Sequence, residues 1–257
     1  MPEENKQIVV ATTNAHKIAE ISAIAGAFGY ETISRDAAGV PPDFDVEEDG
    51  ETFEDNSLLK ARAVFDLLGG RVAVAADDSG LCVDALRGAP GVYSARFADA
   101  TGQDSQDFAN NKKLLRLLSH GEHGSLPPEK RTARFVSVVT LVIPDHPPVI
   151  PDQPPVIPGQ PPVIPDQPPV IPGLTRDPKV IICRGEVEGR IAFHETGSGG
   201  FGYDPLFIPA LEELQTAGLE KYEGRSFGDF PPEDKNKISH RFRALEKLRV
   251  MLNEMVK

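Results

Sequence analysis

Cysteine is scarce in this chain of 257 residues, and its scarcity limits the chemistry available. Cys82 and Cys183 are the only two cysteines. They form no Cys-x-x-Cys pair, and Cys82 lies in an apolar run, so we expect reduced, buried thiols rather than a disulfide framework.

The chain also lacks an excess of positive charge and lacks long apolar runs. The formal net charge of −12 is a poor footprint for nucleic-acid binding, although local lysines can still attract an anionic substrate. The most apolar segment, 135–143, is too short to span a bilayer. The chain opens Met1-Pro2-Glu3-Glu4 without an apolar signal region. We therefore expect a cytoplasmic protein that contacts neither nucleic acid nor membrane.

The most informative feature present is Asp77-Asp78-Ser79-Gly80. It separates the apolar runs 72–76 and 81–83, which are typical of two buried strands joined at a glycine turn. Acids at the end of a strand are well placed to bind a metal or to abstract a proton. The same four residues are equally ordinary as turn chemistry.

A candidate anion site lies near the N-terminus. Residues 8–11 predict a short strand, and a helical apolar stripe begins at Ile18. Thr13 or Asn14 is a plausible N-cap, and Lys17 falls in the first helical turn. Free backbone N–H groups, the helix dipole and the ammonium would face a phosphate. No glycine-rich P-loop is present, and a capped helix with a solvated lysine is the alternative.

An acidic run follows at 43–55, with eight acids and no lysine or arginine. Such a run suits a hard divalent cation, although a solvated acidic loop would also tolerate it. A second helix begins near Phe53, and Lys60 near its start is a second candidate phosphate ligand.

The C-terminal half contains a glycine-rich loop at 197–205. It places Phe201 and Tyr203 beside flexible backbone, which suits a platform for a nucleobase. A hairpin whose aromatics fill the core is the alternative. Residues 234–241 are expected to open the terminal helix, where Ser239, His240 and Arg241 can donate hydrogen bonds to an anion or a base edge.

A proline-rich repeat interrupts this pattern. Pro-Pro-Val-Ile-Pro-Asp/Gly-x occurs four times in 147–174, and fourteen of the 24 prolines lie in 144–178. This density forbids helix and discourages sheet, so polyproline II conformation is expected. The segment lies between the strand-like runs 135–143 and 179–187, so it predicts a long exposed hairpin connection. A neutral insertion without a partner is favoured over a docking segment.

Six motifs together resemble the Ham1-like, inosine-triphosphate-pyrophosphatase-like nucleotide diphosphatases. In chain order they are residues 12–17, 53–61, 76–81, 88–96, 199–205 and 238–241. The resemblance implies a single domain over 7–254, interrupted by the insertion at 144–178. It implies an α/β fold with an elongated mixed sheet, flanking helices and two lobes around a central cleft. Strands interleaved with helices agree with that class.

The resemblance also implies a function. The family hydrolyses deaminated purine triphosphates (dITP, ITP and XTP) to the monophosphate and pyrophosphate with Mg²⁺, and known members are commonly cytosolic homodimers. Asp78 matches the proton acceptor and also approaches the metal, and Glu48 matches the Mg²⁺ ligand. Residues expected to contact substrate are Thr12, Thr13, Asn14, Ala15, His16, Lys17, Lys60, Ser79, Phe201, Gly202, Tyr203, Asp204, Lys235, His240 and Arg241.

The chain departs mildly from the family pattern. Thr13 and His16 stand where many members have smaller residues, often glycine, and the larger side chains narrow the expected phosphate loop. Asp49 replaces a commoner threonine.

The chemistry agrees with this function. A carboxylate near a metal can take a proton from water, and cations can offset the charge that develops on the phosphates. No Cys or Ser pairs with a His in a nucleophilic pattern, so direct attack by water is expected rather than a covalent intermediate. Donors at His240 or Arg241 favour the O6 acceptor of hypoxanthine and xanthine over the amine of adenine. The rejection of guanine stays unassigned. A related pyrophosphatase for other modified bases, or a Pro-rich interaction protein on a decayed enzyme scaffold, are the alternatives.

Overall fold

The computed structural model describes residues 7–98, 106–119, 125–144 and 178–255. Its strands are β1 (Gln7–Val10), β2 (Glu31–Ser34), β3 (Ala73–Val83), β4 (Thr132–Ile143), β5 (Lys179–Ile191) and β6 (Phe207–Pro209). Its helices are α1 (Ala15–Ala27), α2 (Phe53–Leu67), α3 (Gln106–Ser119), α4 (Leu211–Gln215), α5 (Pro232–Lys235) and α6 (His240–Met255). Short 3₁₀ turns lie at Asp84–Leu86, Gly91–Arg96, Pro128–Lys130, Glu220–Tyr222 and Phe227–Asp229.

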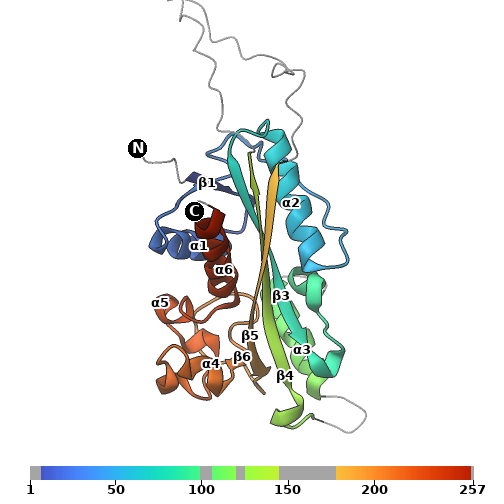
Figure 1. The fold of residues 1–257 in the computed structure, drawn as a ribbon. Coiled ribbons are helices and arrows are strands. Elements are labelled where there is room, and N and C mark those ends of the chain that lie inside the picture. The colour runs from blue at the N-terminus through green and yellow to red at the C-terminus, as the bar shows by residue number, and fades with distance from the viewer. Residues whose placement is uncertain (1–6, 99–105, 120–124, 145–177, 256–257) are drawn as a thin grey trace, which may run out of the picture.

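The strands form one mixed sheet in the order β2-β1-β3-β4-β5-β6. β1 pairs in parallel with β2 and β3, and the remaining neighbours pair antiparallel. The long strands β3, β4 and β5 form the axis of an elongated molecule, with helices on both sides (Figure 1). The expected fold class is confirmed.

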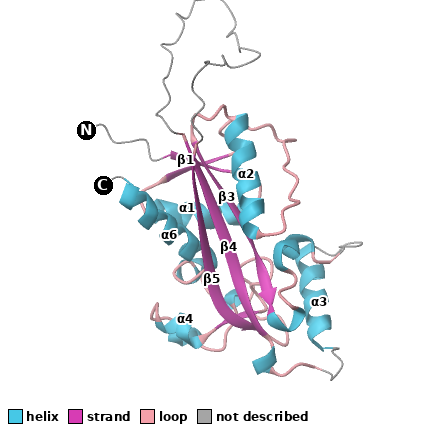
Figure 2. Ribbon diagram, turned by 45° about the vertical axis from the view of Figure 1, so that its right-hand side comes forward, coloured by secondary structure: helices cyan, strands magenta, loops and turns pink. Residues whose placement is uncertain are grey.

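The helices pack where their apolar stripes predict. Ile21 of α1 and Leu245 of α6 share a buried cluster with Val139 of β4. Ala61 and Phe65 of α2 pack in another cluster with β1 and β3. Figure 2 shows α2 on the opposite side of the sheet from α1 and α6. Asn14 caps α1, as expected, because its side-chain oxygen accepts from the backbone N–H of His16 and Lys17.

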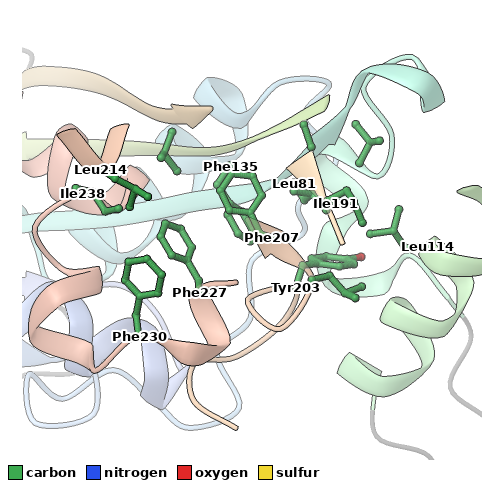
Figure 3. Packing of buried hydrophobic residues seen from close by; sticks show 14 of the residues in the cluster. Leu81, Leu114, Phe135, Ile191, Tyr203, Phe207, Leu214, Phe227, Phe230 and Ile238 are labelled. Atoms are coloured by element: carbon green, nitrogen blue, oxygen red, sulfur yellow. The ribbon is translucent and has the colours of Figure 1, made fainter. Parts of the chain in front are cut away.

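The largest core cluster among the described residues lies at the opposite end of the long strands from these two clusters. It joins Leu114 of α3 to Phe135 of β4 and to Tyr203 and Phe207 beyond β5 (Figure 3). Tyr203 is buried there, and its hydroxyl donates to the backbone oxygen of Ser94 at 2.9 Å.

The prediction of two strands separated by a turn at Asp77–Gly80 is wrong. β3 is continuous through these residues, which pair with Val139, Val138, Ser137 and Val136 of β4. Gly80 is required by close packing rather than by a turn, since a Cβ there would collide with Ser94 Oγ and the carbonyl oxygen of Gly91. The two acids therefore lie inside the sheet.

The terminal helix also begins later than expected. α5 is a separate short helix that starts at Pro232, and α6 starts at His240. Ser239 Oγ accepts from the backbone N–H of Phe242 at 3.1 Å, which is N-cap geometry. Pro231 precedes α5 as its N-cap and Pro232 is its first residue, a position that proline tolerates because its missing N–H is not needed there.

β4 and β5 form the expected hairpin, and Ile143 pairs with Lys179 at the end where the connecting segment 144–178 begins and ends. The repeat itself lies outside the described residues. None of the helices in the described part of the chain is long and apolar enough to cross a membrane.

Candidate active site

The alternation of β3 sends its two acids to opposite faces of the sheet. Asp77 contacts Lys17 and Arg241, which come from α1 and α6. Asp78 contacts Lys60, which comes from α2. Successive side chains of a strand point to opposite faces, so neighbouring carboxylates have different partners and can have different roles.

Asp77 is a buried anchor for cations. Its carboxylate lies 2.8 Å from Lys17 Nζ and 3.4 Å from Arg241 Nε, and it accepts from Ser137 Oγ at 2.5 Å and from Ser79 Oγ at 3.1 Å. Burial raises its pKa, but Lys17 and Arg241 outweigh burial and hold the pKa well below the usual carboxyl range. Asp77 is therefore a permanent anion that orients two cations.

Asp78 is in a different electrostatic state. Its Oδ1 accepts from Lys60 Nζ at 2.8 Å, and its buried Oδ2 has no hydrogen-bond partner among the described residues. Burial raises the pKa of Asp78, and this outweighs the lowering effect of Lys60. A carboxylate with a raised pKa and a vacant oxygen is equipped to accept a proton.

Glu48 joins Asp78 through a shared cation. Lys60 Nζ lies 3.1 Å from Glu48 Oε2 and 2.8 Å from Asp78 Oδ1. The described residues hold no group of three or more His, Cys, Asp or Glu suited to a metal. Two carboxylates around one positive charge, one of them with a buried vacant oxygen, fit Mg²⁺ if the substrate phosphates supply further oxygens.

A cavity of about 120 Å³ lies next to Lys17 and Arg241, the two cations that Asp77 holds. It is lined by Asn14, Lys17, Ser79, Gly80, Ser94, Ala95, Asp107, Asn110, Phe135, Phe201, Gly202, Tyr203, Asp204, Lys235, His240 and Arg241. The structure thus brings together residues from the start of α1, the middle of β3, the glycine loop and the start of α6. A larger open hollow of about 500 Å³ around Arg184 and Arg243 lies elsewhere. Arg184 pairs with Glu186, which also lines the hollow, and Arg243 pairs with Glu213.

Phe201 is the aromatic residue that remains available in the glycine loop. Lys235 Nζ lies 4.8 Å and Arg241 Cζ 5.3 Å from its ring centroid. Asp204 holds Lys235 Nζ at 2.7 Å and accepts from the backbone N–H of Phe201 at 2.8 Å. Tyr203 packs in the core, as the alternative for this loop expected, and also lines the cavity.

Glu20 was missed by the reading of the sequence. It is buried on α1, where its Oε2 pairs with Arg241 Nη1 at 2.7 Å and lies 3.8 Å from Lys235 Nζ. Although burial opposes ionisation, Arg241 and Lys235 lower the pKa of Glu20 to about 2. The available signal was an acid three residues after Lys17, next to Ile21 on the apolar stripe of the helix.

His240 is buried in the same cluster. Burial and the charge of Arg241 lower its pKa well below the ordinary histidine value, so the imidazole is neutral. Its ring stacks on Phe135 at 4.9 Å, and its Nδ1 is without a partner among the described residues. A neutral ring with a vacant nitrogen can read a polar atom of a ligand.

The remaining expected residues lie around the start of α1. Thr12 Oγ1 accepts from the backbone N–H of Asn14 at 3.2 Å. Thr13 and Ala15 are exposed, and His16 stacks on Phe201. Two residues of α3 that the sequence did not indicate also contact the glycine loop. Asp107 accepts a hydrogen bond from the backbone N–H of Gly202, and Asn111 donates one to the Gly202 carbonyl.

The fold and the site define an α/β protein in which two adjacent buried carboxylates hold separate cations, and in which an aromatic residue, Phe201, lines a cavity together with two of those cations, Lys17 and Arg241. A sequence profile of the Ham1 family matches residues 8–153 and 170–251, and the chain belongs to that family. The unmatched residues 154–169 lie within the repeat.

Individual relatives agree. A dITP/XTP pyrophosphatase of Nitratidesulfovibrio vulgaris is 39% identical and covers 94% of this chain and 93% of its own. One of Exiguobacterium sibiricum is also 39% identical, over 96% of each chain. The structure of the Staphylococcus aureus Ham1 protein superimposes with a TM-score of 0.66 at 32% identity, covering 97% of this chain and 99% of that one.

Proposed function

We propose that this protein hydrolyses deaminated purine nucleoside triphosphates, namely dITP, ITP and XTP, to the monophosphate and pyrophosphate, and so removes them from the nucleotide pool. The observation that carries the proposal is the separation of roles between Asp77 and Asp78. One acid orients cations beside a cavity with an aromatic platform, and the other has the raised pKa and vacant oxygen of a base. The names of the relatives supply the substrate class.

The residues of the chain divide the reaction between them. Asn14, Lys17 and Lys60 bind the triphosphate and offset the charge that develops on it. Asp78 accepts a proton from the attacking water through its vacant Oδ2. Glu48 and Asp78 would hold Mg²⁺, which when bound neutralises phosphate charge and polarises the phosphoryl oxygens.

Base recognition falls to the other end of the cavity. Phe201 stacks on the purine, and Lys235 and Arg241 supply donors near it. Donors favour an O6 acceptor and oppose an N6 amine, because a donor facing a donor leaves both groups unpaired after desolvation. The neutral His240 adds a nitrogen that can read the base edge.

The test is a panel of ITP, dITP, XTP, GTP, ATP and dUTP with separate detection of pyrophosphate and phosphate. We expect pyrophosphate from the first three, and ¹⁸O from labelled water in the monophosphate. A preference for dUTP would favour a pyrophosphatase for other bases, and release of single phosphates or label in pyrophosphate would contradict the geometry. No turnover by folded protein would support a decayed scaffold.

A homodimer and a cytoplasmic location are further proposals, both based on the family resemblance. Sedimentation velocity at two protein concentrations tests the first.

A further inference from the structure

His16 makes a contact that joins the two ends of the proposed site. It is exposed at the second position of α1, and its ring lies nearly parallel to that of Phe201, with centroids 5.2 Å apart and an interplanar angle of 14°. The start of α1 is where the triphosphate is proposed to bind, and Phe201 is the proposed base platform. The stack therefore connects the phosphate end with the base end.

His16 contacts Phe201 from outside the cavity. Among the described residues of this helix start, Asn14 and Lys17 line the cavity and His16 does not. Phe201 itself lines the cavity, as do Lys235 and Arg241, which lie over its ring. His16 thus contacts the ring without being one of the residues that line the cavity.

The loop that carries Phe201 needs such support. Gly200 and Gly202 on either side have positive φ values of 75° and 60°. Asp107 and Asn111 bind the N–H and the carbonyl of Gly202, at 2.9 and 3.1 Å. These bonds hold the backbone of the loop and do not reach the Phe201 ring, which is contacted by His16, Lys235 and Arg241.

We propose that His16 is a positioning residue that braces Phe201 for stacking on the base. The inference rests on the proposed function, because it names what supports the platform of that site. It also gives the larger side chain at position 16 a role other than narrowing the phosphate loop.

The test compares His16→Ala with His16→Phe, using His194→Ala at an exposed position in another loop as the control for loss of a histidine. His16→Ala should raise KM for ITP about 2- to 10-fold, the strength of an aromatic pair, with little change in kcat. His16→Phe should restore KM. Inhibition by inorganic tripolyphosphate, which has no base, should be unchanged in both variants.

Two kinetic outcomes would overturn the proposal. Equal weakening of ITP and tripolyphosphate would make His16 a phosphate ligand. A lower KM in His16→Ala would mean that the stack competes with the base.

A second measurement does not depend on catalysis. The chain has no tryptophan, so Phe201→Trp introduces a single indole. Adding His16→Ala should move acrylamide quenching of that indole toward the value for free tryptophan amide, in the absence of any nucleotide. Unchanged quenching would refute the brace even if the enzyme acts on ITP. Increased quenching in a protein inactive on every triphosphate would refute the proposed function and leave the brace intact.

Discussion

Asp77→Asn and Asp78→Asn should impair different properties of the protein, although the two acids are adjacent in the sequence. Asp77→Asn removes the common partner of Lys17 and Arg241 inside the sheet. Asp78→Asn removes the proposed base but leaves Lys60 paired with Glu48. We expect the first variant to lose mainly stability and the second mainly turnover.

The magnitudes follow from burial. The Asp77 side chain is 0% exposed, and the two cations left behind, Lys17 and Arg241, have side chains that are 16% and 2% exposed, so water can solvate neither of them well. Breaking a buried ion pair costs about 3–5 kcal/mol, which is a fall in Tm of about 6–20 °C for a chain of this size. Burial already disfavours the Asp78 carboxylate, so Asp78→Asn should shift Tm by about 4 °C at most. Its turnover should fall at least ~10²-fold.

The pH dependence separates the two further. The pKa of Asp77 is depressed in the folded state, so its stabilisation is complete above the unfolded value near 3.8 and is lost as pH falls toward the folded value. The stability gap between wild type and Asp77→Asn should therefore be full at pH 7, should begin to narrow only below about pH 4, and should close as pH approaches the folded pKa of Asp77. The pKa of Asp78 is raised, so the acid limb of kcat/KM should lie above 3.8.

Urea unfolding followed by circular dichroism at pH 7 and at a series of pH values below 3.8, together with pyrophosphate release, checks these expectations. An Asp77→Asn protein as stable as wild type would show that the buried charges are not coupled as described. A folded Asp78→Asn protein with near wild-type turnover would remove Asp78 from the mechanism.

Three other changes test separate parts of the site and fold. Glu48→Gln should raise the Mg²⁺ concentration for half activity, and an unchanged titration would point to another acid of the run 43–55. Phe201→Ala should weaken binding of every purine triphosphate by about 1–3 kcal/mol in calorimetry. Arg241→Ala should instead reduce the preference for ITP over ATP, and it should also lower Tm because Glu20 and Asp77 lose a buried partner. Equal loss of activity on both nucleotides would reassign Arg241 to phosphate binding. Replacing 145–177 by a short Gly/Asn turn should leave turnover and Tm nearly unchanged, since Ile143 and Lys179 are already paired and closure entropy varies slowly with length; insolubility would show that the repeat packs on the enzyme.

Much of the fold could be predicted because it depends on local pattern. The stripes that define α1 and α2 and the cap at Asn14 follow from neighbours within one or two helical turns. The hairpin of β4 and β5 follows from two apolar runs on either side of a segment that cannot join a sheet. The order of six short motifs was specific enough to indicate the family.

The sequence alone therefore determined the family, the class of fold and many of the polar residues that line the cavity. Only the tertiary structure decided on which face of the sheet, and with which partners, each of those residues lies. Asp77–Gly80 looks like a turn because its residues favour turns, but pairing with the distant β4 holds it in a strand, and the strand then separates two adjacent carboxylates to opposite faces. Likewise, Glu20 became part of the site and Tyr203 part of the core through contacts with residues far along the chain, which local pattern does not encode.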